Sequence, residues 1–349
     1  MRNRAHSGAY IVGVEEAVER LSQRFTLRPG TIVSLGAAGW DGVRDEPVDR
    51  ASGRSVLEVE VERIGVLRTP VVYPDAADQS RRAGGSPFLF AGTVDEVSPL
   101  ERLAAAPRER SALAGLPPPR GFWRLFGNQR EAEDLELEQY VSPELPMPVA
   151  YPVVSLAMLS DTEANVGEPH HIDLPSHSGT IHATCHLAIV IGPEPAYAET
   201  ATSAPTRIAG YATLLSLHDA GPLESLVPPT TDYESRHTTF LSYCGEGQHV
   251  LAPAIGALGM TEMPAGRVAT LRVGDREYAG NTAHYLHDAP AAVEHLSRAL
   301  TLLPGDVIGL GPLGPAVELP AADLTDGELV VAAVDGLQSV RAHVCVARA

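Results

Sequence analysis

The sequence lacks lysine entirely, since all 26 basic residues among its 349 are arginine. Pyridoxal phosphate enzymes, other Schiff-base enzymes and Walker A nucleotide sites each depend on a lysine amine. The guanidinium of arginine stays protonated and cannot replace that amine. These three functional classes are therefore excluded.

Positive charge and long apolar runs are also scarce. The formal net charge of -18 disfavours nucleic acid and anionic membrane surfaces as partners. No apolar run approaches the roughly 18 residues of a membrane span, and the first residues lack the apolar segment of a signal peptide. We therefore expect a cytoplasmic protein with no nucleic-acid partner and no membrane partner.

Cysteine and aromatic residues are few. The three cysteines, Cys185, Cys244 and Cys345, form no disulfide framework and are expected to be small buried apolar groups, with a reactive thiol as the alternative. Aromatic residues make up 5% of the chain, against 32 glycines and 29 prolines. This composition predicts many turns and short strands rather than a helical bundle.

Strand-like runs dominate the sequence from residue 122 onward. Four of them are bounded by turn residues: PVAYPVVSLAML, IHATCHLAIVIG, RIAGYATLLSL and GRVATLRVGDREY. The predicted fold class is mainly β, or α+β.

An internal repeat organises the chain. Residues 17–39, AVERLSQRFTLRPGTIVSLGAAG, align without a gap with residues 292–314, AVEHLSRALTLLPGDVIGLGPLG, and 12 of the 23 positions are identical. Each copy predicts an amphipathic helix, a Pro-Gly turn, a short strand and a glycine-rich bend, followed by further strand. With a single repetition about 275 residues apart, the pattern indicates two copies of one unit and not a solenoid.

The repeat and the local composition divide the chain into three predicted regions. Residues 1–75 are interpreted as a partial repeat of the C-terminal unit. Residues 76–121, rich in proline, arginine and alanine, are interpreted as a linker or embellishment. Residues 122–349 form the predicted core domain.

The core region resembles the fumarylacetoacetate hydrolase family. The segment LLPGDVIGLGPLG at 302–314 is similar to the family's PGDVI-x-TGTP pattern, and HLAIVIG at 186–192 to its ELAVVIG. IAGY at 208–211 and GNT at 280–282 also match, in the family's order. The resemblance implies a mixed β-roll that is usually dimeric, with an acidic divalent-metal site acting on β-dicarbonyl or keto-enol acids.

Carried over residue by residue, the resemblance implies that the family's metal ligands are missing. Its two ligand glutamates fall on Thr184 and His186, and its ligand aspartate falls on Ser216. Because magnesium requires carboxylate-rich oxygen ligands, we expect neither a metal nor another cofactor. The family's asparagine-tyrosine-x-x-histidine signature aligns less well, beginning at Asn128. The predicted catalytic residues are His186, Glu246 and His249, and the predicted substrate-binding residues are Thr184, Ser216, Asn281, Thr282, Leu310 and Pro312.

Histidines could still supply chemistry. On a strand, His182, Thr184 and His186 share one face, so zinc or iron held by imidazole is conceivable. His186 alone could be a general acid or base, because imidazole titrates near neutrality, or it could be structural. His218 and Asp219 are adjacent and should point to opposite faces of a strand, which disfavours an acid/base pair.

Three functions remain open. The first is a metal-independent enzyme that isomerises, cyclises or rearranges an enolisable, polyketide-like small molecule, as in antibiotic biosynthesis. The second is a non-catalytic family member that binds a ligand or an active homologue. The third is a metal-dependent carbon-carbon hydrolase or decarboxylase of a β-dicarbonyl acid. A homodimer is a possible assembly.

Overall fold

The computed structural model describes residues 6, 8, 10, 12–22, 27, 31–36, 54–72, 121–126, 128, 149–153, 158–160, 168–175, 178–221, 247–253, 255–256, 266–324 and 327–346. The chain divides into two compact units, Met1–Leu21 with Pro29–Glu96 and Ser22–Arg28 with Val97–Ala349. None of the described helices is long and apolar enough to cross a membrane.

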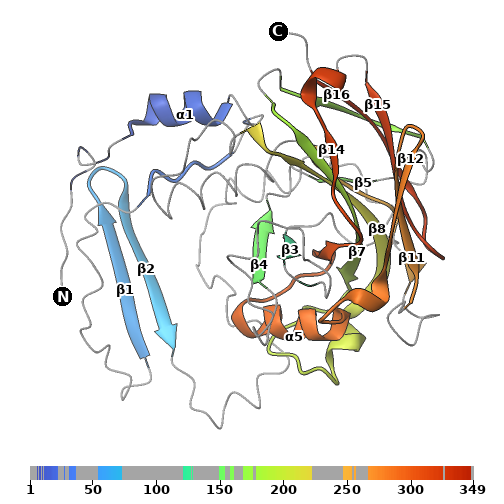
Figure 1. Cartoon of the computed structure of the whole chain (residues 1–349). Helices are drawn as coiled ribbons and strands as arrows, with labels where there is room; N and C mark the ends of the chain where they lie inside the picture. Colours follow the sequence, from blue (N-terminus) through green and yellow to red (C-terminus); the bar gives the residue numbers. More distant parts are fainter. Residues whose placement is uncertain are drawn as a thin grey trace. The chain divides into compact units, whose positions relative to one another are not determined.

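The first unit contains a helix and a β-hairpin (Figure 1). Helix α1 (Val14–Ser22) has acidic residues in its first turn and an ion pair between Arg20 and Glu16 one turn apart. Strands β1 (Arg54–Val61) and β2 (Gly65–Val72) pair antiparallel along their whole length. The helix and the hairpin lie where the repeat predicts helix and further strand, but residues 31–36, where the first copy predicts a short strand, form no regular strand. The superposition of the two copies stays a prediction.

The second unit is built from two β-sheets (Figure 1). The first sheet runs in the order β4-β3-β13-β7-β8-β9-β5, with β14 paired to β7 and β10 paired to β8. Its strands are β3 (Phe122–Phe126), β4 (Val149–Val153), β5 (Met158–Ser160), β7 (Ile181–Ile191), β8 (Ile208–Asp219), β9 (His249–Leu251), β10 (Ile255–Gly256), β13 (Val307–Pro312) and β14 (Val317–Leu319).

The second sheet runs in the order β12-β11-β15-β16-β6. Its strands are β6 (His170–Leu174), β11 (Val268–Val273), β12 (Arg276–Asn281), β15 (Glu328–Val334) and β16 (Val340–Val346). The helical segments among the described residues of this unit are α5 (Ala289–Ala299) and the short 3-10 turns η5 (Ala204–Arg207), η7 (Thr282–His284) and η8 (Ala321–Leu324). The mainly β prediction is confirmed.

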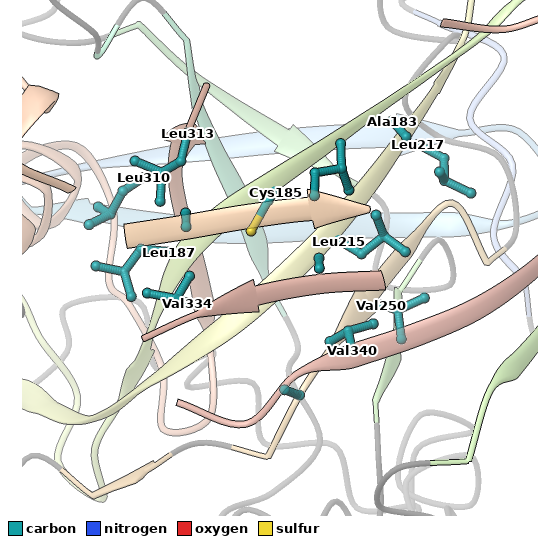
Figure 2. Close-up of a cluster of buried hydrophobic side chains, with 14 of the residues drawn as sticks. Ala183, Cys185, Leu187, Leu215, Leu217, Val250, Leu310, Leu313, Val334 and Val340 are labelled. Carbon is teal, nitrogen blue, oxygen red and sulfur yellow. The ribbon is translucent and has the colours of Figure 1, made fainter. Parts of the chain in front are cut away.

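The main core of the second unit draws on both sheets and on helix α5, and Figure 2 shows part of it. Ala183, Cys185 and Leu187 alternate along β7 and enter this core. From the second sheet come Val334 of β15 and Val340 of β16. Burial raises the pKa of the Cys185 thiol to about 12, which agrees with the prediction of a small buried apolar group.

The opposite face of β7 is buried as well. Ala188 and Val190 pack there with Leu214 of β8 and Phe122 of β3 in a second, smaller apolar cluster. A strand buried on both faces reads as a nearly continuous apolar run, as the segment ATCHLAIVIG does. Polar side chains are therefore unusual on this second face, and they are the candidates for a functional site.

The Pro-Gly-Asp turn before β13 connects two neighbouring strands of the first sheet. Asp306 is buried, and its carboxylate accepts hydrogen bonds from the backbone N–H of Leu303 at 2.8 Å and of Gly121 at 2.7 Å. Gly305 in the same turn has φ +84°, a left-handed conformation suited to glycine. The turn thereby ties the start of β3 to the start of β13.

Candidate functional site

A row of polar residues crosses three adjacent strands on the second face. In the antiparallel register, Thr184 of β7 lies opposite Ser216 of β8, and Ser216 lies opposite His249 of β9. Residues paired in register share one face of a sheet, so the three side chains are neighbours. Ser216 and His249 are completely buried, and Thr184 is nearly so.

Arg124 brings a positive charge to this row. Its guanidinium Nη1 donates a hydrogen bond to Ser216 Oγ at 2.9 Å, and only 3% of the residue is exposed. Arg124 lies on β3, two residues after Phe122, so that the two side chains share a face. The Phe122 ring meets the His249 ring edge to face, with centroids 5.0 Å apart.

His186 is fully buried and hydrogen-bonded to Thr184. Its Nε2 lies 2.8 Å from Thr184 Oγ1, and this hydroxyl also donates to the carbonyl oxygen of Ser216 at 3.3 Å. When the hydroxyl proton goes to the carbonyl, Nε2 must be the protonated nitrogen of His186. Nδ1 then carries a lone pair, and it has no hydrogen-bond partner among the described residues.

The buried charge of Arg124 also controls protonation. Burial, together with the charges of Arg124 and His249, holds the pKa of His186 well below its usual range. Burial and Arg124 lower the pKa of His218 to about 3, with smaller contributions from His182 and His249. The expectation that His186 titrates near neutrality is therefore wrong, because an imidazolium there would be desolvated beside a guanidinium.

Of the other predicted site residues, Pro312 lies beside the polar row, whereas Leu310 does not. Pro312 lies opposite His186 in the register of β13 and β7, next to the polar row. Leu310 instead belongs to the main core with Leu187 and Leu313 (Figure 2). Glu246 falls outside the described residues.

Two further predicted residues form local hydrogen bonds in the turn after β12. The side chain of Asn281 accepts from Ala283 N at 2.8 Å, which caps the short turn η7. Thr282 Oγ1 accepts from Arg267 N at 2.9 Å. Both contacts are structural.

Asn128, aligned with the start of the family signature, is completely buried and fully engaged. Its amide nitrogen donates to the carbonyl oxygens of His287 at 3.0 Å and Leu310 at 2.9 Å. Its Oδ1 accepts from His287 N at 2.7 Å. Asn128 thus joins strand β13 to the segment before α5.

His218 and Asp219 point to opposite faces of β8, as predicted. Asp219 Oδ1 accepts from Gly179 N at 3.1 Å and from Gly221 N at 2.9 Å, so its carboxylate holds backbone. His218 pairs in register with His182, and their rings lie 5.6 Å apart. The two imidazoles extend the polar row along the strands.

The family model for the C-terminal region of fumarylacetoacetate (FAA) hydrolase matches residues 1–72 and 126–345, most of the chain. The chain belongs to the fumarylacetoacetate hydrolase family. No curated protein sequence matches it significantly. The matched residues include both polar strands, β7 and β8, and most of the N-terminal unit.

Solved structures share the fold of this fumarylacetoacetate hydrolase family member. They include 5-carboxymethyl-2-hydroxymuconate delta-isomerase from Mycobacterium smegmatis, 23% identical over 66% of this chain and 80% of that one, with a TM-score of 0.51. A second is 2-hydroxyhepta-2,4-diene-1,7-dioate isomerase from Mycobacterium marinum, 21% identical over 66% of this chain and 77% of that one, with a TM-score of 0.51. A third is fumarylpyruvate hydrolase from Pseudomonas aeruginosa, in complex with Mn2+ and pyruvate, 19% identical over 66% of this chain and 91% of that one, with a TM-score of 0.52. The mixed β-roll prediction is confirmed, and the fold occurs in both isomerases and hydrolases.

The residues at the family's metal positions do not fit a hard divalent cation. Thr184 and Ser216 offer neutral hydroxyls and His186 offers an imidazole, whereas Mg2+ or Mn2+ is bound mainly through carboxylate oxygens. The Arg124 guanidinium is hydrogen-bonded to Ser216, so its charge would repel a dication at that place. These side chains therefore lack both the carboxylate ligands and the negative charge that such a cation needs.

Arg124 and His218 are the site residues that sequence reasoning missed or dismissed. Arg124 stands in the short apolar run FWRLF, where strand alternation places it on the same face as the buried Phe122. A charged residue inside an apolar strand is a usable signal, because burying a charge is costly without partners. Its partner Ser216 is 92 residues away along the chain, so the pairing itself depends on the tertiary fold.

Proposed function

We propose that this family member is a metal-independent enzyme that isomerises, cyclises or rearranges an enolisable, polyketide-like small molecule. The observation that carries the proposal is the buried guanidinium of Arg124, hydrogen-bonded to Ser216 at an aligned metal-ligand position. The side chain supplies a fixed positive charge where relatives place a cation. Its substrate would be a small molecule, with neither nucleic acid nor membrane as a partner.

The charge distribution favours an anionic or enolisable group next to Arg124. A guanidinium presents planar donors to carboxylate or enolate oxygens, and its hydrogen bonds to anions are stronger than neutral ones. The small apolar cluster that shares this face with the polar row includes Phe122, Leu214 and Leu251. A mainly apolar molecule with one acidic oxygen group matches this combination.

The polar row can move a proton without a net change in charge. Nδ1 of His186 can accept a proton from a carbon next to a carbonyl, while Arg124 stabilises the enolate oxygen. Returning the proton to another carbon completes an isomerisation. An anion beside Arg124 also offsets its repulsion of imidazolium, so binding raises the pKa of His186 when the base is needed.

A ligand-binding role without catalysis is the second candidate. The lowered pKa values of His186 and His218 favour it, because both imidazoles are weak bases in the free protein. An enzyme that closes a ring only by holding a flexible chain in one reactive shape would not need a strong base either, because this mechanism involves no proton transfer.

The test measures binding and turnover of acetylpyruvate, a small β-dicarbonyl acid, with the full chain. Binding is followed by calorimetry, and turnover by loss of the enol absorbance, with EDTA, Mg2+ or Mn2+ added. We expect both to be unchanged by EDTA and by the metals. Arg124→Met should weaken binding about 30-fold, the value of a charge-assisted hydrogen bond of about 2 kcal/mol. Arg272→Met, on the exposed face of β11, is the matched control.

His186→Ala separates catalysis from binding. It should lower turnover by about 100-fold, as expected for the loss of a general base, with little change in affinity. Activity that appears only with Mg2+ or Mn2+ would support the metal-dependent hydrolase instead. Binding that needs Arg124 but yields no product would identify a ligand-binding protein, and binding indifferent to Arg124→Met would overturn the proposal.

A further inference from the structure

A second group of metal-type ligands lies on the other sheet, away from the polar row. Strands β6 and β16 pair parallel, with His343 opposite His171 and Cys345 opposite Asp173. Residues two apart on a strand share a face, so these four side chains form a two-by-two array. The intervening residues Ile172 and Val344 point into the main core, which places the array on the outer face.

The ligand atoms of the array are close together. One ligand atom each of His171, Asp173 and Cys345 lies within 4.8 Å of the other two. The ring of His343 stacks on that of His171, with centroids 5.8 Å apart and planes at 28°. In a tetrahedral zinc site, neighbouring ligand atoms are about 3.5 Å apart, so small side-chain rotations would bring these atoms into place.

The backbone leaves room beside the sulfur. Gly327 has φ +84°, and a Cβ added there would lie 2.8 Å from Cys345 Sγ. A side chain at this position would therefore require the thiol or the backbone to shift. Cys345 is also only partly buried, unlike Cys185, which the main core encloses. The thiol is thus positioned and open to a ligand from solvent.

We propose that His171, Asp173 and Cys345 bind one divalent cation of borderline softness such as Zn2+, with His343 able to complete the coordination. Mixed nitrogen, oxygen and sulfur donors on two strands suit this class of metal, and not the Mg2+ or Mn2+ for which carboxylates are used. Binding replaces the thiol proton of Cys345, which is released to solvent, by a metal–sulfur bond.

A cation at this place would join an edge strand to its neighbour. Strand β6 is the last strand of its sheet and hydrogen-bonds to β16 alone among the described strands. A metal bridging β6 and β16 stabilises the folded state by preferential binding.

The test is a Co2+ titration of the full chain purified without metal. Cobalt bound by thiolate gives a near-ultraviolet charge-transfer band, and tetrahedral cobalt gives intense visible bands. We expect one equivalent to bind and Zn2+ to displace it. Cys345→Ser should abolish the charge-transfer band, and His171→Ala should weaken affinity at least about 100-fold, because even indirect partners of a metal contribute 10- to 100-fold.

Cys185→Ala and Cys244→Ser are the matched thiol controls and should retain the band. If Cys345→Ser does not fold, Asp173→Asn on the exposed edge strand serves instead, with an expected loss of affinity and of the tetrahedral spectrum. Zn2+ should raise the thermal unfolding midpoint of the unaltered chain and not that of His171→Ala. A charge-transfer band that survives Cys345→Ser, or the absence of stoichiometric binding, would overturn the inference.

Discussion

Val293 and Val18 occupy equivalent positions in the two repeated segments, yet Val293 is completely buried and Val18 is 43% exposed. Helix α5 around Val293 begins after the N-cap residue Asp288, and five of its residues are buried in the second unit. Helix α1 around Val18 has no buried residue. The same pattern of apolar residues thus forms a helix in both units but is buried in only one.

The two hairpins differ in the same way. Val330 of β15 and Val344 of β16 are completely buried, whereas Val56 of β1 and Leu67 of β2 are each 66% exposed. In the second unit the hairpin lies in a sheet whose inner face packs against residues of β7 and β8. Local sequence therefore specifies the helix and the hairpin in both units, and a neighbouring sheet supplies their burial in the second.

The largest expected difference between the units is their response to acid. His218 of the second unit has its pKa lowered from 6.5 to about 3, so the folded state binds its proton only at much lower pH than the unfolded state. With respect to this residue, the folded state is most stable above pH 6.5, and the free energy of unfolding decreases as the pH falls from 6.5 toward 3. At pH 4 the loss is about 3 kcal/mol from this residue, with His186 acting in the same direction.

Urea unfolding of the full chain at pH 7.5 and pH 4, followed by circular dichroism, measures this loss. His218→Asn should reduce the pH dependence of the second unit's transition. His6→Asn, at an exposed position of the first unit, is the matched control. A transition equally stable at both pH values would contradict the burial of neutral imidazoles in the polar row.

Truncating the equivalent valines sharpens the comparison directly. Val293→Ala should lower the free energy of unfolding by about 2 kcal/mol, from lost apolar burial and the cavity left behind. Val18→Ala should change it by less than about 0.5 kcal/mol, as for other surface substitutions. Urea unfolding of both variants checks this. Equal losses would mean that Val18 is buried by something outside the described residues.

Much of the fold could be predicted because its signals are local. Alternation and turn residues marked the strands that became β7, β8 and β11, and the Pro-Gly-Asp turn marked the start of β13. The shared face of Thr184 and His186 follows from the two-residue period of a strand. The assignment of Thr184 and Ser216 to one site followed from the family resemblance, and their position opposite each other comes from the register of β7 and β8.

The rest depended on register and on distant contacts. The pairing of β13 with β7 shifts between Gly309 and Pro312, so Pro312 lies opposite His186 while Leu310 enters the main core. No local pattern shows where such an irregularity falls. The pKa of His186 likewise depends on Arg124 from another strand, and the array around Cys345 depends on the parallel pairing of β6 with β16.

The smallest expected effect concerns a feature that both copies share. Gly36 and Gly311 are equivalent in the repeat and have nearly the same backbone angle, φ +99° and +109°. A Cβ at Gly311 would come no closer than 3.5 Å to Asn128 and Leu125, and one at Gly36 would meet nothing within 4 Å. Substitution at either place therefore tests backbone strain without a steric clash.

Gly311→Ala should lower the free energy of unfolding by about 1 to 2 kcal/mol, because β13 is held on both sides and cannot relax from a conformation unfavourable for alanine. Gly36→Ala should change it by less than about 0.5 kcal/mol, because residues 31–36 form no regular strand and can adjust. Thermal and urea unfolding of the two variants provide the measurement. A loss at Gly36 as large as that at Gly311 would show that the bend in the first copy is held as rigidly as its counterpart, and the contrast in burial would then not extend to the backbone.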